Sequence, residues 1–353
     1  MLNYSGHGST NAWTAEGLLS ITDIRDMKNT RLPLWVTATC NFSRYDDSET
    51  SGGEMVFLNA NGGAFAMVTT SRAVYSSPNF TLNKAFINQV LKKKNGRRLS
   101  LGEIMCLTKQ STALSSDRNK LNFALIGDPA LKLNHPDYQI RITSINGKEI
   151  DPAAPDTLKA LSQVSMQGQV LTPEGEVDNN FNGILYPSVF DSEETAYTQG
   201  NAGNDVFAYN EQNKVLYAGK ASVKNGAFSF DFIVPKDISY SNRKGSVNLY
   251  AYSEDGRSEA QGVFKEFIVG GSNNEATIDS IGPTIRLFLN DTLFVDGGRT
   301  NAQPCLIAFL HDENGLNTSG NSIGHDIVLN IDNKEKFNLN QYYESDIDSY
   351  VSG

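Results

Sequence analysis

The spacing of hydrophobic residues changes abruptly at His135-Pro136, and this change constrains the fold more than any other feature. Before it, apolar runs at residues 32–38, 63–69 and 123–126 alternate with segments of helical periodicity, which indicates an α/β unit built on a parallel sheet. After it, apolar and polar residues alternate, with Asn-Gly pairs at 146–147 and 225–226 that are typical of hairpins. The sequence therefore predicts two different fold classes in succession.

Three segments follow from this pattern. Residues 1–136 are predicted to form a partial α/β domain, and residues 137–270 an all-β sandwich of immunoglobulin-like size. A Gly-Gly-Ser-Asn-Asn stretch at 270–274 is interpreted as a linker. Residues 271–353 are expected to form a further β-rich segment, incomplete within this chain, with its clearest strand at 284–289.

Three helices are expected in the first segment. Residues 15–27 form a crossover helix, and residues 79–94 carry an apolar stripe of Leu82, Phe86 and Val90. Ser100 and Glu103 have capping-box spacing, so a further helix is predicted to begin at Ser100.

Composition excludes several functions. The net charge of −10 argues against binding nucleic acid, whose phosphates need a basic surface. The three cysteines lie far apart, without metal-ligand spacing or a disulfide framework, so neither a metal nor a cofactor is predicted. No apolar run is long enough to span a membrane, and no signal peptide is found. Because a strand begins directly after Met1, the true start of the protein is expected to lie upstream.

His7 and Cys40 are candidate catalytic residues. Each ends a predicted strand, and Cys40 follows His7 by 33 positions, a crossover length that joins adjacent parallel strands. A single strand-end Cys is usually a small buried hydrophobe, whereas a His and a Cys on consecutive strands form a nucleophile and its base. The backbone amides of Gly8 and Cys40 are then candidate oxyanion donors. The sequence identifies no acid that would orient His7.

The residues around this pair carry a resemblance. The segment resembles the gingipain-type cysteine peptidases, whose fold is similar to that of caspases. The resemblance covers about residues 1–136, and the matching stretches are NYSGHGS at 3–9, TCNF at 39–42, NGGAFA at 61–66, TSR at 70–72 and GDPAL at 127–131. The resemblance implies a Cys40–His7 dyad in a caspase-like sheet. Arg72, at the edge of the site, is a candidate substrate contact.

Further stretches resemble the sortases of the type IX secretion system within that family. They are SRYDD at 43–47, FNG at 181–183, FDFIVPKDI at 230–238, AQG at 260–262, IVGG at 268–271 and IGHD at 323–326. The resemblance implies a transpeptidase on the outer membrane surface that removes the C-terminal secretion signal of cargo proteins. It also implies anionic lipopolysaccharide as acceptor and other outer-membrane secretion components as partners.

Two alternatives stay open. One is a gingipain-like endopeptidase without transfer, and the other is a non-catalytic fragment, because the family has strands before the one that bears His and this chain begins almost at that strand. Of the remaining candidates, Cys106 and Cys305 are expected in packed cores. His311 and His325, each beside an Asp, are expected to make loop hydrogen bonds rather than bind metal.

Overall fold

The computed structural model describes residues 1–94, 96–203, 205–276, 281–316 and 326–353. They form two compact units, Met1–His135 and Pro136–Gly353. The second unit continues past residue 270, where the sequence pattern suggested a further boundary. Among the described residues, no helix is long and apolar enough to cross a membrane.

The first unit is built on a four-stranded sheet. Its strands, in the order in which they pair, are β1 (Leu2–Ser5), β2 (Leu34–Ala38), β3 (Ala66–Thr70) and β6 (Phe123–Ile126). The first three are parallel, as predicted, whereas β6 runs antiparallel to β3.

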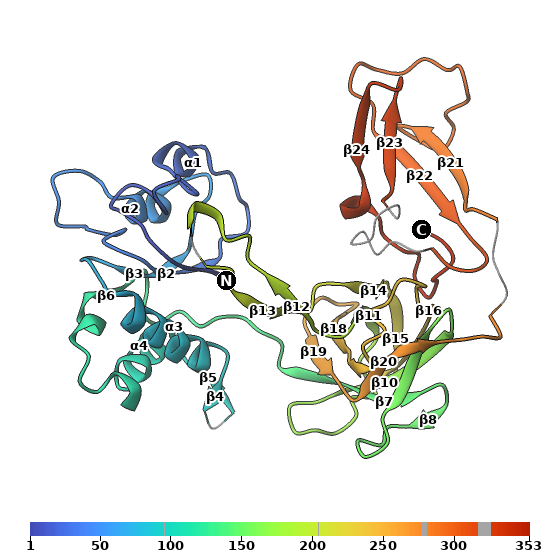
Figure 1. The fold of residues 1–353 in the computed structure, drawn as a ribbon, viewed down its shortest axis with the longest axis horizontal. Coiled ribbons are helices and arrows are strands. Elements are labelled where there is room, and N and C mark those ends of the chain that lie inside the picture. The colour runs from blue at the N-terminus through green and yellow to red at the C-terminus, as the bar shows by residue number, and fades with distance from the viewer. Residues whose placement is uncertain (95, 204, 277–280, 317–325) are drawn as a thin grey trace. The chain divides into compact units, whose positions relative to one another are not determined.

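Helices cover both faces of this sheet (Figure 1). One face carries α1 (Ile21–Asp26) and α2 (Gly52–Leu58), and the other carries α3 (Ser76–Val90) and α4 (Leu101–Lys109). Consecutive β2 residues therefore enter different cores: Val36 packs with Leu82 and Phe86 of α3, while Trp35 packs with Ile24 and Val56. Because both faces are buried, the strands appear in the sequence as unbroken apolar runs.

The helix bounds differ from the predictions in three places. The helix predicted over 15–27 is only α1, which starts after a capping box formed by Ser20 and Asp23. The helix predicted over 79–94 ends at Val90, and a small hairpin follows, β4 (Lys93–Lys94) with β5 (Arg97–Arg98). Helix α2 was not predicted, although Ser51 and Glu54 form a capping box in front of it.

The capping box of Ser100 and Glu103 is confirmed for α4. Two short 3-10 helices, η1 (Thr112–Leu114) and η2 (Arg118–Asn122), lead into β6.

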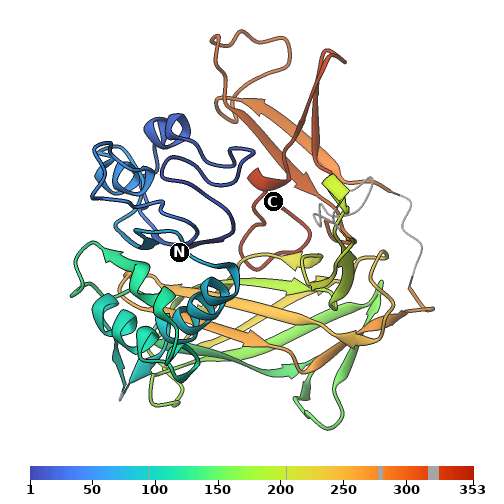
Figure 2. The same ribbon diagram turned by 60° about the vertical axis from the view of Figure 1, so that its left-hand side comes forward.

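The second unit is rich in β-structure, and its main sheet closes on itself (Figure 2). Seven strands pair in a ring, which closes because β10 pairs both with β16 and with β7. In ring order they are β10 (Gln163–Leu171), β16 (Ala227–Ile233), β15 (Ala221–Lys224), β11 (Gly183–Phe190), β18 (Ser246–Ser253), β19 (Glu259–Phe264) and β7 (Tyr138–Ile145).

This ring differs from the two open sheets of the predicted immunoglobulin-like sandwich. In a sandwich and in a closed barrel alike, residues that face the core alternate with residues that face outward. The alternating pattern alone therefore does not distinguish the two architectures. Closure depends on β7, which pairs in parallel with β19 and antiparallel with β10. The interior holds one core with Val164, Met166, Phe230 and Phe232.

Smaller elements complete the second unit. Strand β14 (Val215–Ala218) pairs with β11, and β8 (Lys148–Glu149) with β7. A three-stranded sheet contains β17 (Arg243–Lys244), β20 (Phe267–Ser272) and β9 (Asp156–Ala160), so the glycines predicted as a linker end a strand. The hairpins are β12 (Glu194–Tyr197) with β13 (Ala208–Glu211), β21 (Thr284–Leu289) with β22 (Leu306–His311), and β23 (Val328–Ile331) with β24 (Glu335–Asn338). Two 3-10 turns are η3 (Asn201–Gly203) and η4 (Asn340–Tyr342).

Candidate active site

The pairing of β1 with β2 fixes where His7 and Cys40 lie. The register joins Leu2 to Trp35 and Ser5 to Ala38, a constant offset of 33 positions, and the Gly6 amide still donates to the Ala38 carbonyl at 3.3 Å. The same offset separates His7 from Cys40, and each residue lies two positions beyond the last paired residue of its strand. Paired residues of parallel strands point to the same side of a sheet. The backbone therefore brings both residues to one sheet edge.

Cys40 lies on the face of the sheet that α3 covers. Leu34, Val36 and Ala38 belong to the core shared with α3, and Cys40 packs against the same core. On β1, Asn3 accepts a hydrogen bond from Asn83 of α3 at 3.0 Å. Strand β1 ends at Ser5, two residues before His7.

No hydrogen bond joins the two candidate side chains within the described residues. The half-buried Cys40 thiol donates instead to the Val74 carbonyl, with an Sγ–O distance of 3.5 Å, and the His7 side chain is exposed. Catalytic hydrogen bonds are often open in the absence of substrate. A turn of the thiol away from Val74 would be needed for the pair to close.

The backbone around the pair offers two donors. In the described part of the chain, neither the Gly8 nor the Cys40 amide donates a hydrogen bond. Gly8 also packs tightly, because a Cβ there would lie 2.3 Å from the Oγ1 of Thr39. That Oγ1 is buried and has no partner among the described residues. Glycine is thus required by space as well as by the approach of a substrate.

A group of buried hydroxyls lies at the ends of β2 and β3, and the sequence alone did not reveal it. Thr37 donates to Thr69 at 2.8 Å, and the hydroxyls of Ser43 and Thr69 lie 2.9 Å apart. The Thr70 hydroxyl donates to the carbonyl of Thr39. These fully buried groups tie β2, β3 and the loop after Cys40 together. The runs of threonine at 37–39 and 69–70 were the available signal.

Two buried asparagines hold the segment that accepts the thiol. Asn119 donates to the side chain of Asn79 at 3.1 Å and accepts from the Tyr75 amide at 3.1 Å. Asn79 in turn donates to the Ala38 carbonyl at 3.5 Å. The chain at Val74 is therefore fixed relative to the end of β2.

Arg72 is engaged by a carboxylate of the loop that follows Cys40. Its guanidinium donates to both oxygens of Asp46, at 2.9 and 2.5 Å. The hydrogen bond from Arg72 is the main cause that lowers the pKa of Asp46 below its usual value. The predicted contact of Arg72 with substrate stays a prediction, and it would require this ion pair to open.

The other candidates from the sequence lie apart from this edge or outside the described residues. Cys106 and Cys305 are exposed, not packed in cores as expected: Cys106 lies on the solvent side of α4, and Cys305 lies just before β22 begins. His311 ends β22, whereas His325 falls outside the described residues. No group of three or more His, Cys, Asp or Glu side chains in the described ranges is arranged to hold a metal ion.

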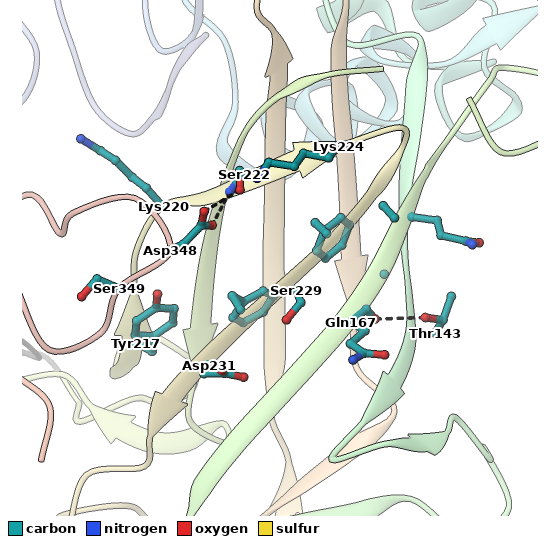
Figure 3. A pocket seen from close by; sticks show the side chains of 15 residues that line it. Thr143, Gln167, Tyr217, Lys220, Ser222, Lys224, Ser229, Asp231, Asp348 and Ser349 are labelled. Atoms are coloured by element: carbon teal, nitrogen blue, oxygen red, sulfur yellow. Dashed lines mark hydrogen bonds between the residues drawn. The ribbon is translucent and has the colours of Figure 1, made fainter. Parts of the chain in front are cut away.

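A pocket with a volume of about 600 Å³ lies in the second unit (Figure 3). It is flanked by β10, β16 and the C-terminal segment, where Asp348 accepts hydrogen bonds from the amide and hydroxyl of Ser222, at 2.6 and 2.5 Å. Its outward side chains are mainly neutral and polar, such as Gln167 and Ser229. None of the candidate catalytic residues lines it.

Comparison with known families gives one match, and it lies in the first unit. Residues 1–134 match the model of peptidase family C25, a family of cysteine peptidases. The search of curated proteins returned no match.

Solved structures give more particular likenesses. The chain is similar to dimeric latent PorU from Porphyromonas gingivalis, with 31% identity and a TM-score of 0.45, over 99% of this chain and 32% of PorU. It is also similar to the Arg-specific cysteine proteinase gingipain R, with 16% identity and a TM-score of 0.34, over 74% of this chain and 52% of gingipain R. The chain thus spans about a third of the length of PorU and about half that of gingipain R.

Proposed function

We propose that this chain supplies the catalytic dyad of a cysteine peptidase, with Cys40 as nucleophile and His7 as general base and then general acid. The observation that carries the proposal is the shared offset of 33 positions, which matches the dyad to the register of β1 and β2. The match of residues 1–134 to the model of peptidase family C25 supports it.

The chemistry follows from the two side chains. His7 takes the proton of the Cys40 thiol, and the thiolate attacks the carbonyl carbon of a peptide bond. The C–N bond then breaks, His7 returns the proton to the leaving amine, and an acyl-enzyme remains. Water or an acceptor amine, deprotonated by His7, attacks the thioester and releases the acyl group.

The unpaired amides of Gly8 and Cys40 would stabilise the negative oxygen that forms during both attacks. Donors that are already oriented stabilise the developing charge more effectively, because they need no rearrangement during the reaction. The packing of Gly8 against Thr39 and the hydroxyls beneath β2 and β3 supply that rigidity.

The more specific part of the proposal is transfer rather than hydrolysis. By resemblance to the type IX secretion sortases, cargo proteins with C-terminal secretion signals would be the substrates, and anionic lipopolysaccharide would be the acceptor. The protein would then act at the outer membrane surface together with other secretion components. A caspase-like arrangement of the complete catalytic domain belongs to the same proposal.

Alkylation of the full chain tests the dyad. Cys106 and Cys305 are replaced by Ser, because both are exposed and would react. Iodoacetamide labelling at neutral pH, followed by intact mass, is compared for wild type, Cys40→Ala, His7→Ala and the control His311→Ala. Loss of the imidazole should slow labelling of Cys40 by at least about ten-fold. This factor is smaller than the one that general acid–base catalysis usually contributes. Equal rates in wild type and His7→Ala would exclude the dyad.

A second assay separates transfer from hydrolysis. The chain is incubated with a peptide substrate, with and without an added amine such as glycinamide. A product joined to the amine supports a transpeptidase, and hydrolysis alone supports an endopeptidase. Labelling of Cys40 without turnover identifies a non-catalytic chain.

A further inference from the structure

Two carboxylates of the loop after Cys40 are paired with arginines. Asp46 forms two hydrogen bonds with the guanidinium of Arg72, and Arg44 lies 3.3 Å from a carboxylate oxygen of Asp47. A bidentate ion pair uses both oxygens of the carboxylate in a planar geometry. Arg72 therefore occupies both oxygens of Asp46, and the Nε of Arg44 lies 4.0 Å from one of them.

This ion pair is attached directly beside the nucleophile. The carbonyl of Arg72 accepts a hydrogen bond from the amide of Asn41 at 3.2 Å, and Asn41 follows Cys40. Two residues further, Ser43 donates its amide to Thr70 at 2.9 Å. The backbone thus holds both partners of the ion pair at the carboxyl ends of β2 and β3.

Apolar surface flanks the same position. Tyr45, in the loop, is 58% exposed, and Tyr75, next to the carbonyl that accepts the Cys40 thiol, is 78% exposed. Exposed aromatic rings close to a nucleophile provide contact area for uncharged side chains.

We infer that the Arg72–Asp46 ion pair sets the specificity of this site, so that it takes peptides with an uncharged residue, not Arg or Lys, on the acyl side of the cleaved bond. The inference rests on the proposed peptidase function. Recognition of a basic side chain needs a carboxylate that is free to accept it, and Arg72 occupies the one attached beside Cys40. Glu49 is the third carboxylate of this loop, exposed and without an ion pair among the described residues.

The local charge is measured first, because this readout needs no turnover. In the full chain with Cys106→Ser and Cys305→Ser, Cys40 is alkylated by anionic iodoacetate and by cationic bromoethyl-trimethylammonium. Arg72→Gln should raise the ratio of cationic to anionic rates by about five-fold, the order expected for one unmasked unit charge nearby that acts oppositely on the two reagents. The rise should shrink at high salt.

Two variants make the result specific. Arg97→Gln breaks an equally exposed bidentate ion pair with Glu103, on a different part of the unit, and should leave the ratio unchanged. Arg72→Gln with Asp46→Asn should restore the wild-type ratio. An unchanged ratio in Arg72→Gln, or an equal change in Arg97→Gln, would overturn the inference.

Cleavage is measured next, with peptides that differ only in the residue before the scissile bond: Arg, Lys, Ala, Ser or Tyr. Wild type should prefer the uncharged residues, and Arg72→Gln should gain at least about five-fold in kcat/KM for Arg and Lys over Ala. A wild-type preference for Arg that Glu49→Gln abolishes would contradict the inference. If no peptide is cleaved, the proposed peptidase function of the chain fails, and the alkylation ratio still decides the role of Arg72.

Discussion

The hydroxyl of Tyr4 donates a 2.6 Å hydrogen bond to the carbonyl oxygen of His7. The ring of Tyr4 stacks on Trp13, with 4.3 Å between ring centroids, and the Thr14 amide donates to the same His7 carbonyl at 2.9 Å. The backbone of the candidate base is therefore held by a side chain that lies three residues before it and by a turn that follows it.

Tyr4→Phe should loosen His7 without disturbing the aromatic stack. The lost hydrogen bond is expected to lower the free energy of unfolding by about 0.5–1.5 kcal/mol. It should also slow the His7-dependent alkylation of Cys40. Both tryptophans of the chain, Trp13 and Trp35, lie in the first unit, so their fluorescence in urea reports the unfolding of that unit. Tyr197→Phe, whose ring is exposed in the second unit, is the control and should change neither quantity.

Gly8→Ala should be destabilising because of its contact with Thr39. A Cβ at 2.3 Å from Oγ1 forces the backbone to shift, at a cost of about 1–3 kcal/mol. Combining it with Thr39→Ala makes space, so the double variant should be less destabilised than the sum of the two single changes. Gly282→Ala meets no atom within 4 Å and serves as the control. Additive effects of the two changes would show that Thr39 is not the obstacle.

Asn119→Leu should release the segment that holds Val74. The change removes the partner of the buried Asn79 and of the Tyr75 amide, and an unpaired buried polar group costs about 1–3 kcal/mol. Hydrogen exchange of the Tyr75 amide should accelerate more than that of β6 residues. Exchange that accelerates equally throughout the unit would instead indicate global destabilisation.

Stability should fall at acidic pH partly through Glu103. Hydrogen bonds from Arg97 are the main cause that lowers the pKa of Glu103 from 4.5 to about 2. A carboxyl whose pKa is lowered on folding stabilises the protein above its unfolded pKa, and this contribution disappears as pH falls through the folded value. The difference in unfolding free energy between wild type and Glu103→Gln should therefore shrink between about pH 5 and pH 2. A difference that is constant over this window would contradict the shift.

Asp348→Ala should free the C-terminal segment from the ring of strands. Asp348 accepts from the amide and the hydroxyl of Ser222, and no other side chain of residues 343–353 makes two hydrogen bonds to β15 in the described structure. Amides of this segment should exchange faster, with β18 and β11 unchanged. Asp346→Ala is the matched control, because in the described structure Asp346 is hydrogen-bonded through its backbone, with its amide donating to Ser352 and its carbonyl accepting from Ser349, and not through its side chain.

The sequence by itself determined the elements whose signals are local. The apolar runs located β2, β3 and β6, because strands buried on both faces need such runs. The Ser100–Glu103 spacing marked the start of α4, since a capping box is formed within one turn. The distance from His7 to Cys40 indicated adjacent parallel strands, which β1 and β2 are. The helix at 15–27 was overestimated because helical periodicity did not reveal that Trp13 and Leu19 pair as an isolated bridge.

Only the tertiary structure decided the contacts between segments distant in sequence. The ring of strands closes through β7 and β10, and the alternating pattern that makes those strands is equally compatible with two open sheets. The ion pair of Arg72 with Asp46, the Tyr4–His7 hydrogen bond and the thiol contact with Val74 all depend on where loops meet. Local patterns specify which face of a strand is buried. Partner choice depends on packing over the whole unit, and no short window of sequence contains that information.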